Sequence, residues 1–509
     1  MAQRRHIRAS EAQDGRNERP ARGYGEPEAG AYGYTPPMEL SPEAQALAPI
    51  LVAVVVLWVT EALPLAVTAL LGAVACVVAG VAPAKEVFRP FADPLIFLFI
   101  GSFILAEGIK RHGLDRRLAY GVLSVPWVDE RPRRILAAVA FVSVLISAFI
   151  SNTCTAAMML AIVAGILGTV ETAASTSGQR PHAGFATSLF LCVAFAASIG
   201  GLATPIGTPP NLIGLAFIRD QAGVAVSFLT WCAIGIPLVV VMATVAVRVL
   251  AWLFPAGVER LVGVSAYVAV ERARLGPWTM GQYSTAAAFA ITVVLWVLPG
   301  MLLVVLSAEH PLCRWLAQRL PEGVAALIGA ILLFLLPGDR AAATGLRQRA
   351  LSWRETRIDW DIVLLYGGGM ALGELCFSTG LAAALGQSIT TLIPAGDWSG
   401  TVLVAVAAVV AVVTSEFTSN AASANMVVPV VIALARATGN EPLPAALAAT
   451  FAASLGFMMP VSTPCNALVY GSGRVPLKAM MASGAVIDVA GTLVVTAAML
   501  IAGRVWTAP

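Results

Sequence analysis

The sequence predicts an all-α polytopic membrane protein with about 11 transmembrane helices and two re-entrant hairpins. Composition is the first observation behind this prediction. The 509 residues are 58% hydrophobic and only 12% charged, whereas soluble domains carry about 25% charged residues. Long stretches without any charge are the second observation, and one runs from Ile135 to Val170. The net charge of +3 is too small to indicate nucleic acid, so the expected surrounding is a lipid bilayer.

The stretch from Ile135 to Val170 is a poor fit to one straight helix. Its 36 residues would form a helix roughly 54 Å long at 1.5 Å per residue. The hydrocarbon core is about 30 Å thick, and two full spans would need roughly 40 residues plus a turn. Two shorter helices that meet at the polar tip Ser151-Asn152-Thr153 fit better, because these residue types end and cap helices. A second tip of the same kind occurs at Ser419-Asn420-Ala421.

The two halves of the chain repeat these features in the same order. Residues 151–159 read SNTCTAAMM and residues 419–427 read SNAASANMV. Further along, residues 195–211 read FAASIGGLATPIGTPPN and residues 451–466 read FAASLGFMMPVSTPCN. Interrupted segments at corresponding positions of two halves indicate the binding site of a secondary transporter. Arginines flank the first hairpin but are scarce around the second, which predicts inverted repeats with the first hairpin opening to the cytoplasm.

Hydropathy and charge together divide the chain into four expected parts. These are a disordered cytoplasmic tail (1–42), a first repeat (43–255) with scaffold helices 43–126, hairpin 134–170 and broken helix 184–218, an amphipathic cytoplasmic connector (256–280), and a second repeat (281–509) with scaffold helices 281–394, hairpin 399–436, broken helix 443–473 and final helix 479–503. We expect a multi-pass protein of the plasma (inner) membrane with a cytoplasmic N-terminus.

The helix starts within the breaks predict an anion site. Each hairpin has a second helix that begins just after its Ser-Asn tip, and Thr208-Pro209 and Thr463-Pro464 begin two further helices. The first backbone N–H groups of a helix lack partners and carry the positive end of its dipole. Four such starts could converge and bind a carboxylate or sulfate without any Arg or Lys.

The same breaks also supply oxygen atoms for a hard cation such as Na⁺. Ser147 and Ser151 share a helical face, and Ser415 and Ser419 repeat that spacing. A cation beside each tip would attract the anion without any proton transfer. Glu416, the only charged residue between Asp397 and Arg436, is a functional candidate by its depth. We favour the alternative that it accepts backbone N–H groups and holds the tip, since a fixed carboxylate would repel an anion.

From about residue 45 to its C-terminus, the sequence resembles the divalent anion:sodium symporters, which carry dicarboxylates, citrate or sulfate. The resemblance lies in LWVTEALPLAVTALLG at 57–72, SNT at 151–153, TPIGTPPN at 204–211, SEFTSNAAS at 415–423 and MPVSTPCNALVYGSG at 459–473. It implies inverted repeats, a homodimeric scaffold and an elevator-type movement of the transport domain.

The resemblance also implies residues for each site. The first Na⁺ site would use Ser147, Ser151, Asn152 and Gly207, and the second Ser415, Thr418, Asn420 and Ser462. Substrate would meet Ser151, Asn152, Thr153 and Thr208 on one side, and Ser419, Asn420 and Thr463 on the other. The coupling ion would be Na⁺, in two or more copies. Ala421 departs from the family pattern, because many members carry a third hydroxyl residue at that position.

The function that these features predict is secondary active import of di- or tricarboxylates of the succinate, malate or fumarate type, coupled to Na⁺. A sodium-independent dicarboxylate exchanger or a sulfate carrier on the same fold stays open, and an ion channel is a more distant alternative. We do not expect an enzyme. Gly471-Ser472-Gly473 superficially resembles a nucleophile elbow, but that chemistry needs a nearby base such as His, and the histidines all lie in polar flanks or loops.

Overall fold

The computed structural model describes residues 40–177, 182–307, 309–340, 347–392 and 400–506. This part of the chain is mostly helical, with one small antiparallel sheet. Strand β1 (Pro337–Arg340) pairs with β2 (Arg347–Arg349), and Pro337 lies opposite Arg349. The all-helical expectation overlooks this hairpin because neither strand shows the alternation of apolar and polar residues that predicts a strand.

The elements of the first half precede the connector that the sequence places after residue 255. They are α1 (Pro42–Thr60), α2 (Leu65–Val78), α3 (Ala84–Val87), the 3₁₀ turn η1 (Arg89–Ala92), α4 (Pro94–Arg111), α5 (Leu114–Leu123), α6 (Pro132–Ser147), α7 (Asn152–Ser177), α8 (Ala183–Gly200), α9 (Pro209–Phe217), the π turn η2 (Ile218–Ala222) and α10 (Phe228–Leu253).

The connector forms a helix of its own, and the second half follows it. The elements are α11 (Val264–Arg274), α12 (Met280–Val305), α13 (Pro311–Arg319), α14 (Glu322–Leu335), the two strands, the 3₁₀ turn η3 (Trp353–Glu355), α15 (Trp360–Ser378), α16 (Leu381–Leu392), α17 (Gly400–Phe417), α18 (Asn420–Ala437), α19 (Pro442–Ala452), α20 (Pro464–Gly471) and α21 (Leu477–Trp506).

Several of these helices are long and apolar enough to cross a bilayer. Eight described helices meet this test, and α13 with α14, bent by 66° at a short break, could form a ninth span. The helices α2, α8 and α19 are apolar but shorter than a full span. The chain is therefore a multi-pass membrane protein, while the expected number of about 11 crossings stays a prediction.

Four of the helix junctions coincide with the polar motifs. They lie between α6 and α7 (148–151), between α8 and α9 (201–208), between α17 and α18 (418–419), and between α19 and α20 (453–463). Proline occupies the first position of both α9 and α20, where its missing N–H group and fixed φ favour a helix start. Local sequence thus ends and restarts the helices inside otherwise apolar segments.

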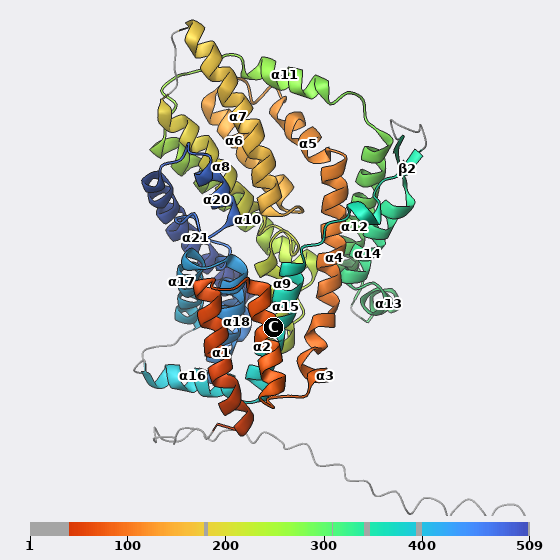
Figure 1. Cartoon of the computed structure of the whole chain (residues 1–509), viewed down its shortest axis with the longest axis vertical. Coiled ribbons are helices and arrows are strands. Elements are labelled where there is room, and N and C mark those ends of the chain that lie inside the picture. The colour runs from red at the N-terminus through yellow and green to blue at the C-terminus, as the bar shows by residue number, and fades with distance from the viewer. Residues whose placement is uncertain (1–39, 178–181, 308, 341–346, 393–399, 507–509) are drawn as a thin grey trace, which may run out of the picture. The chain divides into compact units, whose positions relative to one another are not determined.

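The two helix pairs with polar tips point in opposite directions. In Figure 1, α6 and α7 lie toward the end that carries α11, whereas α17 and α18 lie toward the end where α1 begins. Hydrogen bonds support this placement, because Leu261 N donates to Glu130 O at 2.7 Å and Ser41 Oγ donates to Thr379 O at 3.2 Å. The start of α1 and the opening of the first pair are therefore on opposite sides. The sequence predicts a cytoplasmic tail and also a first hairpin that opens to the cytoplasm. These two predictions conflict, because α1 begins on the side opposite to that opening. The tail before Leu40 itself lies outside the described residues.

Buried aromatic contacts join the two halves close to the helix breaks. The Trp231 ring on α10 stacks on Phe451 of α19 with 4.3 Å between ring centroids, and Phe195 of α8 meets Phe457 at 5.1 Å. All four side chains are fully buried. Such pairs add about 0.5–1.5 kcal/mol to what burial alone contributes. The broken segments of the two halves are therefore packed together rather than held by separate cores.

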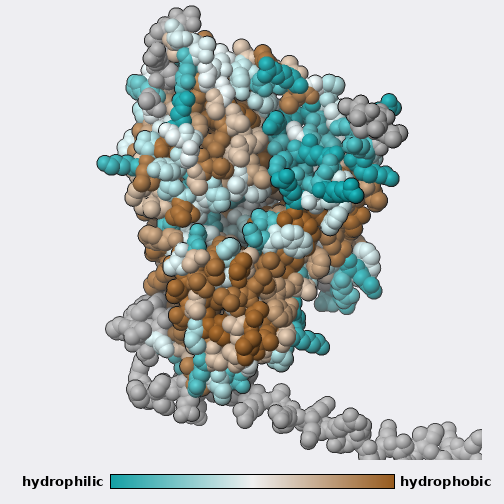
Figure 2. Space-filling view, viewed as in Figure 1, coloured by the Kyte–Doolittle hydropathy of each residue, from teal (hydrophilic) through white to brown (hydrophobic). Residues whose placement is uncertain are grey.

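The outer surface carries apolar side chains where lipid would lie. Figure 2 shows hydrophobic residues gathered over α1 and α2 and hydrophilic residues gathered near the β1–β2 hairpin. Val56 on α1 is 53% exposed and Val78 on α2 is 82% exposed. A soluble protein rarely shows a continuous apolar face of this kind, so the surface agrees with a bilayer environment.

Candidate functional site

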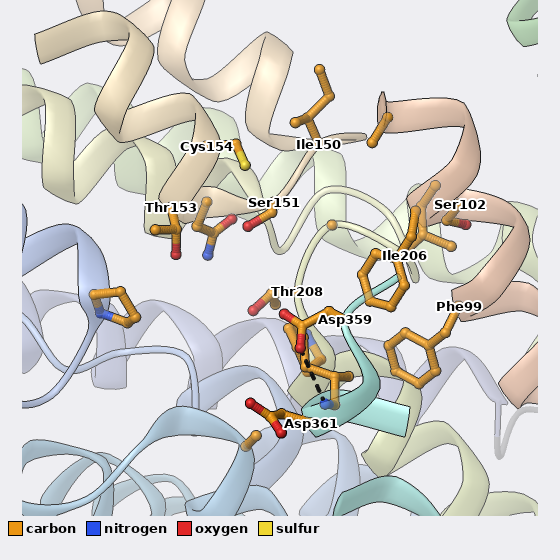
Figure 3. A pocket seen from close by; sticks show the side chains of 18 of the residues that line it. Phe99, Ser102, Ile150, Ser151, Thr153, Cys154, Ile206, Thr208, Asp359 and Asp361 are labelled. Carbon is orange, nitrogen blue, oxygen red and sulfur yellow. Dashed lines mark hydrogen bonds between the residues drawn. The ribbon is translucent and has the colours of Figure 1, made fainter. Parts of the chain in front are cut away.

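Both polar tips and both Thr-Pro helix starts open onto one cavity of about 520 Å³. Its lining includes every residue predicted to contact substrate, namely Ser151, Asn152, Thr153, Thr208, Ser419, Asn420 and Thr463. Gly207, Ser462 and Ala421 line it as well. Figure 3 shows Ser151, Thr153 and Thr208 around this space. Residues more than 300 positions apart in the sequence thus meet at one place.

The first tip surrounds the Asn152 side chain with oxygen atoms. The amide orientation that satisfies its neighbours has the Asn152 nitrogen donate to Ser147 Oγ at 2.6 Å, Ala197 O at 3.1 Å and Gly207 O at 3.3 Å. The Ser147 side chain is fully buried. These three acceptor oxygens are hard ligands of the kind that Na⁺ accepts, so the first tip offers oxygen atoms for a cation.

The second tip repeats this arrangement around Asn420. Ser415 Oγ is fully buried and lies 2.8 Å from both Asn420 Oδ1 and Ala453 O. One hydroxyl proton cannot serve both acceptors fully, so three oxygen atoms again crowd together. Ala453 holds the place in FAASLG that Ala197 holds in FAASIG. The likeness of the two halves thus extends from sequence to individual contacts, and this site also fits a cation with oxygen ligands.

A further pair of asparagines holds the unwound segments, and sequence reasoning did not assign it a role. Asn211 Nδ2 donates to Gly201 O and Thr204 O, each at 2.8 Å. Asn466 Nδ2 donates to Gly456 O at 2.9 Å and Met459 O at 3.0 Å. Each asparagine side chain thus bonds to the carbonyl groups ten and seven residues before it in the sequence. The sequence signal for this role is an asparagine two residues after each Thr-Pro pair.

The Oδ1 atoms of these two asparagines are buried and have no hydrogen-bond partner within the described part of the chain. Buried polar groups are normally paired. Through their Nδ2 bonds, both asparagines hold the unwound segments that precede α9 and α20.

The helix starts at the cavity differ in how they are capped. Ser419 Oγ accepts from Ala422 N at 3.2 Å, and Thr463 Oγ1 accepts from Asn466 N at 3.1 Å. No side chain among the described residues caps α9, which follows Thr208.

The first two residues of α9, Pro209 and Pro210, have no N–H group, and Asn211 N donates to Thr208 O at 3.2 Å. The Thr208 side therefore offers fewer free N–H groups than the Thr463 side, where Cys465 retains its N–H group.

Thr418 is the predicted site residue that the structure directs elsewhere. Its Oγ1 donates to Trp58 O at 3.1 Å, and the residue is absent from the cavity lining. The hydroxyl therefore ties the second tip to the end of α1. Ser147 and Ser415 are likewise behind the cavity wall, but their hydroxyl groups reach Asn152 and Asn420 at the surface of the cavity.

Glu416 makes the contacts expected of a positioning group. Its carboxylate accepts from Met458 N at 2.9 Å and from Met459 N at 3.0 Å, and the residue is 5% exposed. It thus holds the segment that leads to Ser462. Asp488 on α21, also 5% exposed, accepts from Phe457 N at 3.3 Å and contacts Glu416. The sequence signal for it was a lone carboxyl group in the final apolar segment.

Charged residues to which the sequence assigned no role at the site also line the cavity. They are Glu107, Lys110, Arg357, Asp359 and Asp361. Asp359 Oδ1 accepts from Ile362 N at 3.4 Å and so caps the start of α15, and Figure 3 shows Asp359 and Asp361 beside the cavity. Helix ends commonly carry such charges, so nothing in the local sequence separated these from ordinary capping residues.

Comparisons with known proteins agree with this geometry. A family model described as the sodium:sulfate symporter transmembrane region matches residues 34–509. The sodium-dependent dicarboxylate transporter SdcS of Staphylococcus aureus (strain USA300) is 29% identical over 442 residues, which cover 86% of this chain and 82% of that protein. The family and this relative are transporters rather than enzymes.

Two solved structures share the fold. The YdaH transporter of Alcanivorax borkumensis aligns with a TM-score of 0.54 at 15% identity, covering 82% of this chain and 87% of that one. MtrF of Neisseria gonorrhoeae, described with a class of antimetabolite efflux pumps, aligns with a TM-score of 0.53 at 12% identity, covering 91% and 95%. At these identities the likeness concerns the fold alone.

Proposed function

Because the chain belongs to the divalent anion:sodium symporter family, we propose that it imports di- or tricarboxylate anions coupled to Na⁺. One observation carries the proposal: both Ser-Asn tips and both Thr-Pro helix starts line a single cavity of about 520 Å³. Small-molecule sites typically measure about 300–1,000 Å³. A dicarboxylate spans two anion sites at once, which suits two tips that face one space.

The neutral donors of the cavity suit reversible binding of a dianion. Hydroxyl, amide and peptide N–H groups at helix starts attract carboxylates, yet they carry no full charge that would retain the substrate. The relative SdcS transports dicarboxylates by its name, which supports the succinate, malate or fumarate type. Lys110 and Arg357 at the same cavity would offset part of the repulsion from its acidic residues.

Sodium would supply the missing positive charge. The oxygen clusters around Asn152 and Asn420 provide the hard ligands that Na⁺ accepts. One ion at each would neutralise a dianion bound between the tips, so each ligand raises the affinity for the other. We therefore propose at least two Na⁺ ions per transport cycle.

Sulfate is the second candidate substrate. The description of the matching family model names sulfate, and Ala421, which has no hydroxyl group, lines the cavity. One carboxylate of a four-carbon substrate would thus lose a partner on that side, whereas a compact tetrahedral anion needs fewer contacts. Sodium-independent exchange of dicarboxylates is the third candidate function, and it requires that the transport rate not depend on a sodium gradient.

We propose inverted repeats, an elevator-type movement and a homodimer as the frame for this chemistry. The opposite directions of the two helix pairs support the repeats, and the apolar surface of α1 and α2 offers area for lipid or a second subunit. For orientation in the plasma membrane, the arginines of α5, α6 and α11 favour a cytoplasmic α11 side. This orientation puts the start of α1 outside and revises the expected cytoplasmic N-terminus.

The test is uptake of labelled succinate into proteoliposomes with and without an inward Na⁺ gradient. We expect uptake only with Na⁺, and loss of uptake in both Asn152→Ala and Asn420→Ala. Asn440→Ala, the same substitution at a residue outside the cavity lining, is the matched control. Sodium-indifferent exchange would contradict the coupling, and normal uptake by both cavity variants would contradict the site. A panel with sulfate, citrate and malate as competitors assigns the substrate.

A further inference from the structure

A second cavity, of about 800 Å³, lies at the end of the protein that carries α11. The starts of α6 and α8 and the link between α10 and α11 form its walls. It shares no lining residue with the cavity at the two tips. The transport chemistry derived above therefore leaves this cavity without a role.

The second cavity is basic. Arg131, Arg133, Arg134 and Arg260 line it. Asp129 lies 3.9 Å from both Arg131 and Arg260, at the limit of an ion pair, and so satisfies neither fully. Arg133 forms no ion pair within the residues that the structure describes. With the lining residue Glu259 and the neighbouring Glu130 counted as well, four arginines face three carboxylates, which leaves a net charge of +1.

Two helix starts add to this positive potential. The cavity is bordered by the beginnings of α6 and α8, which are 16 and 18 residues long. Within the described part of the chain, neither start is capped by a side chain. The positive dipole ends of both helices therefore lie beside the arginines, an arrangement that binds phosphate groups.

The walls of the cavity are fixed by hydrogen bonds that do not involve these arginines. Glu130 accepts from Leu261 N at 2.7 Å and, through Oε1, from Gly263 N at 2.9 Å. On the other side, His182 N donates to Ala256 O at 2.8 Å. Gly257 has a φ of +71°, and a Cβ there would lie 2.3 Å from His182 Nε2. A site built in advance binds its ligand at a lower ordering cost.

The remaining lining indicates what kind of anion fits. Leu136, Phe185 and Phe254 present apolar surface beside the arginines. Leu136 and Phe185 lie near the starts of α6 and α8, and Phe254 follows the end of the apolar helix α10. A free phosphate ion would use the arginines alone, whereas a phospholipid uses both surfaces. Basic pockets between membrane helices bind head groups of this kind.

We propose that this cavity binds the head group of an anionic phospholipid, with phosphate on Arg133 and Arg260 and the start of an acyl chain against Phe185 and Phe254. A lipid there would join the first helix pair to the connector α11. Four arginines around one cavity favour a head group with two phosphates, as in cardiolipin, over phosphatidylglycerol with one. The proposal does not depend on which anion the protein transports.

Native mass spectrometry of the full chain in detergent tests the proposal. Cardiolipin, phosphatidylglycerol, phosphatidylcholine or inorganic phosphate is titrated in, and bound copies are counted. We expect one tightly bound cardiolipin, weaker phosphatidylglycerol and no specific phosphatidylcholine. The double variant Arg133→Gln/Arg260→Gln should bind cardiolipin at least about tenfold more weakly. Arg116→Gln on α5, which lies outside the cavity lining, should bind it as the wild type does.

Two results would overturn the proposal. Equal cardiolipin binding by the double variant and the wild type would remove the site. Binding of inorganic phosphate that needs both arginines, without preferential retention of any anionic lipid, would assign the cavity to a soluble phosphate instead. A thermal midpoint in detergent equal to that of the wild type shows that the double variant is folded.

Discussion

Replacement of Asn466 by alanine tests the hydrogen bonds that shape the second cation site. The Asn466 side chain donates to Gly456 O at 2.9 Å and to Met459 O at 3.0 Å, and both bonds are buried or partly buried. Alanine removes both of these bonds, although Gly456 O still accepts from Ser462 Oγ at 2.7 Å and Met459 O from Ser462 N at 3.3 Å. A hydrogen bond contributes about 0.5–1.5 kcal/mol net, so the loss of two costs about 1–3 kcal/mol. The segment that presents Ser462 loses its fixed shape.

The predicted consequence is weaker sodium binding. If about 2 kcal/mol of this cost falls on the ordered, Na⁺-binding form, the sodium concentration for half-maximal uptake rises about thirtyfold. Saturating Na⁺ should partly restore the rate, because the ion stabilises the form that it binds. Asn211→Ala removes the corresponding bonds to Gly201 O and Thr204 O, so we expect a shift of similar size.

Initial rates of succinate uptake, measured in proteoliposomes over a range of Na⁺ concentrations, give this shift directly. Asn440→Ala controls for the substitution, and the thermal midpoint in detergent identifies variants that fail to fold. An unchanged sodium dependence in both Asn211→Ala and Asn466→Ala, at wild-type rates, would refute the reasoning. A shift in only one variant would refute the equivalence of the two halves.

Three further predictions concern single positions at the cavity. Glu416→Gln turns one carboxylate oxygen into a donor that faces Met458 N or Met459 N, and a hydrogen bond to a charged group contributes about 1.5–3 kcal/mol. We expect a lower thermal midpoint and slower uptake, and wild-type values of both would remove the positioning role. Gly207→Ala places a Cβ 2.4 Å from Gly201 O, so transport should be lost. The control variant Gly168→Ala, whose Cβ meets nothing within 4 Å, should transport normally. Activity in Gly207→Ala would show that the loop can shift. Ala421→Thr adds a hydroxyl group at the cavity and should raise the ratio of succinate to sulfate uptake, and an unchanged substrate profile would count against a role for this position.

Sequence reasoning located the helix breaks because their causes are local. A Ser-Asn pair supplies a cap, and a Thr-Pro pair ends one segment and starts the next helix. The structure accordingly starts α7 at Asn152 and α20 at Pro464. The repetition of the motifs then indicated that both halves serve one site. The residues with these signals line the same cavity.

The features that the sequence did not reveal depend on contacts between distant segments. Asp361 follows a polar loop, and only the packing of α15 brings it to the cavity. The direction of the Thr418 hydroxyl depends on the end of α1, 360 residues away. The side on which α1 begins depends on how many helices cross before the first pair, and hydropathy gives such counts poorly when helices are shorter than a full span.

The most direct test of the central claim is a structure of the protein determined with succinate and Na⁺ present. The account predicts one dicarboxylate in the cavity of about 520 Å³, in contact with both Asn152 and Asn420, and a cation beside each of these residues. Substrate bound at one tip alone, or at a place that neither tip reaches, would contradict it.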